Sequence, residues 1–170
     1  MNIGEGLAKV RRDCLPFLAM IEPSAAGLYR GCFRDGAAVF EDEVFRDRKP
    51  KNMPVELHQA ADAWFSARFG VRYRGAGLFC TGDAVQAASH GDVYRIYPVG
   101  GFQFCWSPRV KDLHAWCDEN GFLEKSPDAL TNALAGLDYR EDDLAEALAS
   151  GSEIMLACKR YIGVQAAGMR

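Results

Sequence analysis

Residues 77–106, GLFCTGDAVQAASHGDVYRIYPVGGFQFCW, decide the fold class of this chain. Gly77–Thr81 is predicted to be a strand, and a short helix of small residues is predicted after it at Ala84–Ser89. Val93–Tyr97 alternates and is rich in residues that favour strands, and Phe102–Trp106 repeats this pattern after a double-glycine turn. Strands that cluster in this way, instead of alternating with long helices, favour an α+β domain over a doubly wound one.

Helix and strand signals also flank this stretch. The clearest helix is predicted from Pro54 to Phe69, with Gly70 as its stop. Serine–proline pairs at Ser107 and Ser126 predict helix starts, because serine caps a helix and proline fits its first turn. Three further helices are predicted: a leading helix over residues 1–22 that stops near Pro23, a helix from the first serine–proline pair through Trp116, and a helix that starts at a capping box of Asp138 and Glu141 and ends near Gly151. Strands are predicted at Leu28–Cys32 and Ala37–Phe45. A hairpin of Ile154–Ala157 with Tyr161–Val164 is predicted to close the fold, followed by a loose tail from Gln165.

The composition indicates a single globular domain over residues 1–170. Hydrophobic residues make up 49% of the chain and charged residues 25%, which argues against disorder. The net charge of −3 shows no overall excess of basic residues, which is the usual indication of nucleic-acid binding. Binding through a local basic patch stays open.

We expect a cytosolic protein, in its own cell or in a host cell, with no signal peptide and no membrane partner. The first residues hold acid rather than base, and no apolar run approaches the roughly 20 residues that cross a bilayer. The six cysteines are scattered, without a Cys-x-x-Cys pair or a histidine–cysteine cluster of zinc spacing. This pattern indicates a reducing compartment and no structural metal.

Three short segments in a fixed order carry the chemistry that the sequence suggests. An arginine lies in Leu28–Gly31, a threonine in Gly77–Gly82, and a glutamate in Gly151–Leu156. All three are predicted at strand edges. Together they are a set that can grip a dinucleotide and stabilise a cation on its ribose.

The order of these segments resembles the mono-ADP-ribosyltransferase family of the arginine-serine-glutamate type, seen in cholera-like toxins and in bacterial and phage effectors. Tyr29–Gly31 matches the tyrosine-arginine-glycine that binds NAD on the first core strand. Phe79–Gly82 matches the leading aromatic residue and the central threonine of the family's serine-threonine-serine segment, but replaces both serines. Glu153–Leu156 is similar to the strand with the catalytic glutamate. The resemblance implies a split antiparallel or mixed sheet core, at about residues 26–165, with flanking helices.

The resemblance also implies roles for single residues. Glu153 would stabilise the positive charge that develops on the ribose as the nicotinamide bond breaks, and Cys80 and Thr81 would orient it. NAD would be held by a second group of residues: Arg30, Tyr29, Gly31, Phe79 and Phe102. The implied activity is transfer of ADP-ribose from NAD, the substrate, to a macromolecular target, with a protein favoured over a nucleic acid.

Two departures from the family pattern leave the acceptor open. Arginine-modifying members carry a second acid two residues before the catalytic one, where this chain has Gly151, and Cys80 replaces the first serine. A guanidinium acceptor is therefore less favoured, whereas another side chain, a nucleic acid or water stays open. The alternatives to a transferase are an NAD glycohydrolase and a non-catalytic inhibitor that uses the same scaffold to cover a partner protein.

Other functional classes have little support. His58, His90 and His114 are dispersed and none lies in a nucleophile motif, so a triad hydrolase is not indicated. Neither a P-loop nor a glycine-rich dinucleotide motif occurs. The basic stretch Arg46–Lys51 is expected to be a solvated loop, with a contact to phosphates of NAD or of a target as the alternative.

Overall fold

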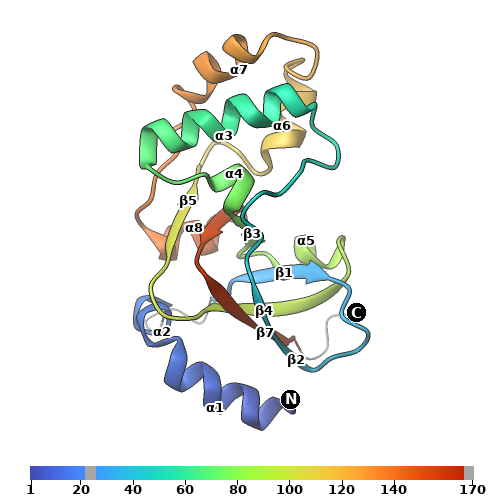
Figure 1. Cartoon of the computed structure of the whole chain (residues 1–170), viewed down its shortest axis with the longest axis vertical. Helices are drawn as coiled ribbons and strands as arrows, with labels where there is room; N and C mark the ends of the chain where they lie inside the picture. Colours follow the sequence, from blue (N-terminus) through green and yellow to red (C-terminus); the bar gives the residue numbers. More distant parts are fainter. Residues whose placement is uncertain (22–25, 167–170) are drawn as a thin grey trace.

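One seven-stranded sheet forms the centre of the protein (Figure 1). The computed structural model describes residues 1–21 and 26–166. The strands are β1 (Tyr29–Cys32), β2 (Val39–Glu43), β3 (Leu78–Thr81), β4 (Asp92–Pro98), β5 (Gln103–Trp106), β6 (Glu153–Ala157) and β7 (Arg160–Gln165). Their order in the sheet is β2-β7-β4-β1-β3-β6-β5, and every neighbouring pair is antiparallel. The predicted α+β class is confirmed.

Helices lie at both ends of the sheet. The described residues form α1 (Ile3–Asp13), α2 (Leu15–Ile21), α3 (Val55–Phe69), α4 (Tyr73–Ala76), α5 (Ala84–Ala88), α6 (Leu113–Glu119), α7 (Pro127–Leu134) and α8 (Leu144–Ser150). The prediction for α3 is confirmed, and the helix ends at Gly70 in the left-handed conformation. The start of α7 is also confirmed, since Ser126 caps it by accepting the N–H of Ala129. Figure 1 shows α3, α6 and α7 together at one end of the molecule and α1 and α2 at the other.

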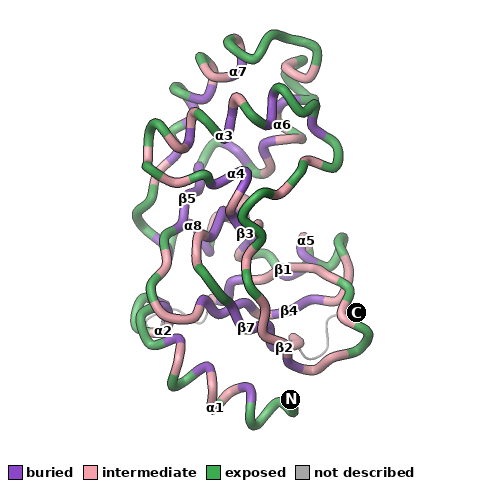
Figure 2. The backbone as a smooth tube through the Cα atoms, viewed as in Figure 1, coloured by how far each residue is buried: buried purple, intermediate pink, exposed green. Residues whose placement is uncertain are grey.

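Two hydrophobic cores lie on opposite faces of the sheet at β6. Ile154 belongs to the core that α1, α2 and α8 cover, and Met155 belongs to the core that α3, α6 and α7 cover. Successive residues of a strand point to opposite faces, so β6 is buried on both. Burial on both faces explains why Ile154–Leu156 is continuously apolar instead of alternating. Figure 2 shows this burial along the strands, with solvent-exposed segments on the outer helices.

The hairpin predicted for the last two strands is wrong. β6 pairs with β3 and β5, whereas β7 pairs with β2 and β4. The short link at Cys158-Lys159 therefore carries the chain between separate positions in the sheet. Each strand gains two hydrogen-bonded neighbours in this way, where an isolated hairpin would supply one.

Two predicted helix starts are also wrong, and aspartate caps account for the difference. α6 begins after Asp112, whose carboxylate accepts a backbone N–H of the first turn at 2.8 Å, and not after Ser107. α8 begins after Asp143, which caps it in the same way at 3.1 Å. The segment of the predicted capping box runs beside β5 instead, where Arg140 and Trp106 exchange backbone hydrogen bonds.

The leading helix is present but divided. α1 ends at Asp13 and α2 starts at Leu15, so the chain breaks at Cys14, which is buried against the sheet. The predicted stop near Pro23 lies outside the described residues, and so does the tail from residue 167 onward.

Candidate functional site

The three chemical segments lie on three neighbouring strands. β1, β3 and β6 are consecutive in the sheet, and Thr81 of β3 stands opposite both Tyr29 of β1 and Glu153 of β6. Residues directly opposite each other on antiparallel strands project from the same face of a sheet. Tyr29, Thr81 and Glu153 therefore form one row, which we call the cross-strand row.

A hollow of about 430 Å³ lies beside Tyr29, which is the one member of the cross-strand row that lines it. Tyr29, Gly82 and Gly151 line it, so each of the three segments contributes. The rest of its lining is Asp83, Ala84, Leu148, Ala149 and Ser150. The volume lies in the range of roughly 300–1,000 Å³ that is typical of small-molecule sites.

Thr81 ties the end of β3 to the start of β6. Its hydroxyl oxygen accepts the N–H of Asp83 at 3.1 Å, and its single proton is shared between the Gln86 side-chain oxygen at 3.1 Å and the Gly151 carbonyl at 3.3 Å. Its contact with β6 is thus made through the backbone before Glu153. The sequence predicted that Thr81 orients Glu153, and this geometry allows it to do so through the strand.

Glu153 is a nearly buried carboxylate whose ionic partner is Arg74. Arg74 Nη1 lies 2.8 Å from Glu153 Oε1, and the two side chains are only 5% and 11% exposed. Burial raises the pKa of the Glu153 carboxyl, and the charge of Arg74 acts in the opposite direction. Arg74 therefore favours the ionised form of a group that burial alone would shift towards its neutral form. Sequence reasoning missed Arg74; its only local signal is the density of arginines over residues 68–74.

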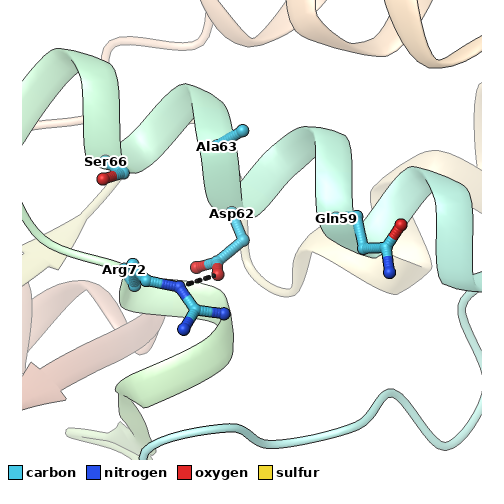
Figure 3. Close-up of a pocket in the computed structure, with 5 residues that line it drawn as sticks. All are labelled: Gln59, Asp62, Ala63, Ser66 and Arg72. Atoms are coloured by element: carbon cyan, nitrogen blue, oxygen red, sulfur yellow. Dashed lines mark hydrogen bonds and ion pairs between the residues drawn. The ribbon is translucent and has the colours of Figure 1, made fainter.

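Asp62 of α3 fixes the backbone that presents Arg74. Its buried carboxylate accepts the N–H groups of Arg74 at 3.1 Å and Gly75 at 2.8 Å. It also pairs with Nε of Arg72 at 2.8 Å, beside a second hollow of about 290 Å³ along α3 (Figure 3). A Cβ at residue 75 would lie 2.6 Å from the Asp62 carboxylate, so this close approach requires glycine. One carboxylate thus anchors α4 and the arginine that faces Glu153.

Two arginines lie over the ring of Phe79, which projects from the same face as Thr81, and a third arginine bonds to the Phe79 backbone. The guanidinium carbons of Arg48 and Arg74 lie 3.7 and 4.4 Å from the centre of its ring. Nη1 of Arg30 donates to the Phe79 backbone carbonyl at 2.7 Å. Burial and the charge of Arg74 lower the pKa of Arg48 to about 10. The basic stretch that contains Arg48 is thus only in part the solvated loop that the sequence predicted.

Cys80 and Phe102 lie away from this cluster. Cys80 stands opposite Ile154 in the core under α1, α2 and α8, where burial raises its pKa to about 12. Phe102 packs edge-on against Phe17 of α2, with the ring centres 5.4 Å apart, beyond the far end of β6. Their positions support a packing role and not the predicted roles in orienting Glu153 and binding NAD.

Gly31 acts by allowing a helix to approach β1. A Cβ at this position would lie 2.0 Å from the Ala87 carbonyl oxygen of α5. With glycine there, α5 rests directly on β1, and the residues at its start line the hollow beside Tyr29. Gly31 therefore has a packing role in the structure, and its contact with a dinucleotide stays a prediction.

Metal-binding and membrane-spanning features are not found in the part of the chain that the structure describes. Over residues 1–21 and 26–166, no group of three histidine, cysteine or carboxylate side chains is placed to hold a metal ion. Over the same ranges, no helix combines the length and the apolar character needed to cross a bilayer. His58 is buried on α3, where burial lowers its pKa.

Comparison with known proteins returns no match: neither a family model, nor a curated protein, nor a solved structure is significantly similar to this chain.

Proposed function

We propose that this protein is an NAD-dependent mono-ADP-ribosyltransferase that modifies a macromolecular target, with a protein as the expected acceptor. The cross-strand row carries the proposal. Three segments that are far apart in the sequence, and that were singled out for their chemistry, lie on adjacent strands and line one hollow. This adjacency supports an ADP-ribosyltransferase-like core for the sheet.

Glu153 is the catalytic residue in this proposal. Cleavage of the bond between nicotinamide N1 and ribose C1′ develops positive charge on the ribose, which a fixed, partly desolvated carboxylate stabilises. The bonding electrons leave with neutral nicotinamide. A nucleophilic atom of the acceptor forms the new bond to C1′, and its proton passes to solvent.

Thr81 and Arg74 are positioning residues for Glu153. The Thr81 hydroxyl lies against the backbone at Gly151, and the Lys111 carbonyl accepts the Glu153 N–H at 2.7 Å. Arg74 holds the side chain of Glu153 by pairing with its carboxylate. These contacts fix Glu153 at both its backbone and its side chain, which is what electrostatic stabilisation of a short-lived cation needs.

Charges of both signs surround Gly151. A Cβ at Gly151 would lie 3.9 Å from Nζ of Lys111 and 4.0 Å from Oδ2 of Asp83. These charges do not select among acceptors, so the preference for an acceptor other than arginine rests on Gly151 itself, which supplies no acid where arginine-modifying relatives have one.

A non-catalytic binding protein on the same scaffold is the second candidate. The observation that favours it is that the Glu153 carboxylate is 11% exposed and already paired with Arg74. A carboxylate neutralised by an internal cation has less of its field available for a substrate. Under this alternative, the protein would cover a partner without turning over NAD.

Incubation with labelled NAD and a cytosolic lysate tests the proposal. Label on macromolecules and free nicotinamide are measured for the wild type, for Glu153→Gln and for a matched control, Glu124→Gln. Glu124 is an exposed acid between α6 and α7, so its replacement removes the same charge away from the site. We expect labelling of a discrete band that persists in the control and is lost in Glu153→Gln.

The other outcomes are equally informative. Nicotinamide release without labelled macromolecules would identify a glycohydrolase. Full activity of Glu153→Gln would show that the catalytic carboxylate is assigned wrongly. Failure to bind NAD at all would favour the non-catalytic binding protein.

A further inference from the structure

Arg48 carries a charge that no carboxylate of the described residues pairs with. The backbone N–H of Arg48 donates to the Gly75 carbonyl oxygen at 2.7 Å, and the side-chain Nε lies 3.5 Å from the Arg74 carbonyl oxygen. Its two terminal nitrogens donate to no residue in the ranges 1–21 and 26–166. Arg48 nevertheless lies against the Phe79 ring at 3.7 Å, so its position is fixed before any ligand binds.

The neighbouring cations are already engaged, in contrast to Arg48. Arg30 donates to the Phe79 carbonyl, and Arg74 faces Glu153. Nε of Arg74 is buried without a hydrogen-bond partner. The guanidinium groups of Arg48 and Arg74 lie over one ring and repel each other, and Arg30 adds a third positive charge at the Phe79 carbonyl. Glu153 supplies one negative charge against these three, so a bound anion would lower the remaining repulsion.

We propose that Arg48 forms an anion site for the pyrophosphate of the bound dinucleotide, in the field of Arg74 and Arg30. The identity of the ligand rests on the proposed function. Arg30 was expected to help hold NAD, but the pyrophosphate contact is assigned to Arg48, because neither terminal nitrogen of Arg48 donates to a described residue. A planar guanidinium binds two phosphate oxygens at once, which suits this role better than a point charge.

The position of Arg48 fits a ligand that also reaches Glu153. Phe79, against which Arg48 lies, precedes Thr81 by two residues, about 7 Å along the strand. Thr81 is the centre of the cross-strand row. A dinucleotide is long enough to place its pyrophosphate at Arg48 and its reacting ribose at Glu153.

Titration calorimetry with inorganic pyrophosphate at low salt tests the site without any need for turnover. Arg48→Gln should weaken binding by about tenfold or more, since it removes a charge-assisted, two-pronged contact. Arg46→Gln is the matched control, because Arg46 is exposed on the same loop and loses the same charge. It should change the affinity less than twofold. Arg48→Lys, which keeps the charge but not the planar fork, should fall between them.

Glu153→Gln is an independent test, because it should strengthen pyrophosphate binding whereas Arg48→Gln should weaken it. Glu153 is an anion close enough to stabilise the charge of Arg48, so its neutralisation should tighten pyrophosphate binding severalfold. Equal affinities for Arg48→Gln and Arg46→Gln would overturn the proposal, as would loss of binding in Arg30→Gln but not in Arg48→Gln. Tighter, Arg48-dependent binding of a short single-stranded oligonucleotide would overturn the dinucleotide as the source of the phosphate.

The two proposals fail separately. If pyrophosphate binding depends on Arg48 but no nicotinamide is released from NAD, the anion site stands and the transferase is wrong. If NAD is turned over but Arg48→Gln leaves the affinity for pyrophosphate unchanged, the proposal of a transferase stands and that of the anion site is wrong.

Discussion

Replacement of Arg74 by methionine isolates the ion pair at the centre of the candidate site. Methionine retains much of the apolar packing but removes the charge that lies 2.8 Å from Glu153. Both side chains are nearly buried, and loss of one partner from a buried pair costs about 3–5 kcal/mol. We expect the free energy of unfolding to fall by this amount at pH 8, out of the roughly 5–15 kcal/mol that is ordinary for a protein domain.

The destabilisation should shrink as the pH falls, and Glu153 determines the sign. Burial raises its pKa in the folded protein, and loss of Arg74 should raise that pKa further. The folded variant then binds the proton more tightly than the unfolded chain does. Its stability is therefore highest at low pH and falls as the pH rises from the unfolded pKa towards the folded pKa. At pH 5, close to the unfolded pKa, most of the ionisation penalty should be gone, and the lost contact with Phe79, up to about 2 kcal/mol, should account for most of what remains.

Urea unfolding at pH 5 and pH 8 measures this difference, with wild type, Arg74→Met and the double variant Arg74→Met/Glu153→Gln compared. The double variant should regain most of the stability lost at pH 8, because it no longer buries an unpaired carboxylate. The same destabilisation at both pH values, or no recovery in the double variant, would refute the ion-pair explanation.

Three further predictions concern the framework of the site. Gly31→Ala should lower the free energy of unfolding by about 1–3 kcal/mol, since its Cβ would lie 2.0 Å from the Ala87 carbonyl oxygen. The control is Gly101→Ala, whose Cβ would meet nothing within 4 Å and which should change stability by less than about 0.5 kcal/mol in the same thermal or urea unfolding assay. Asp62→Asn should cost about 1–3 kcal/mol and broaden the NMR signals of the α4 amides, because the carboxylate holds the N–H groups of Arg74 and Gly75; a folded variant with unchanged α4 signals would contradict this anchoring role. The four buried cysteines should react with a thiol reagent at pH 8 far more slowly in the native protein than in urea, because burial raises their pKa values; they are Cys14, Cys80, Cys105 and Cys117. Rapid labelling of all six thiols of the native protein would count against the packing described above.

Local patterns were sufficient to predict most of the strands and the principal helix. Alternation and β-forming residues identified β4, and the left-handed glycine after Phe69 marked the end of α3. Arg30, Thr81 and Glu153 were chosen as residue types with a shared chemistry. The sheet brings Thr81 and Glu153 into one row, which no local pattern could establish, but the third member of that row is Tyr29 and not Arg30.

Long-range contacts account for what sequence reasoning missed. Arg74 and Glu153 are separated by 79 positions, and the arginine lies between a predicted helix and a predicted strand, where no pattern marked it. Cys80 was expected to help orient Glu153, but alternation along β3 turns it to the opposite face of the sheet from Glu153. The predicted hairpin failed for a related reason, because the partners of β6 and β7 lie far from them in the sequence.

The position of the last two strands has a consequence for the order in which the protein forms. Within residues 1–21 and 26–166, β2 pairs with no strand but β7, and β5 with no strand but β6, although β2 and β5 are made much earlier. During synthesis both early strands leave the ribosome before their partners exist, and contacts between such distant segments form slowly. Glu153 is the first residue of β6, so the carboxylate joins the site only when the end of the chain has folded into the sheet. Under the proposed function, a chain truncated before Glu153 should release no nicotinamide from NAD, and activity should begin only after β6 has joined the sheet.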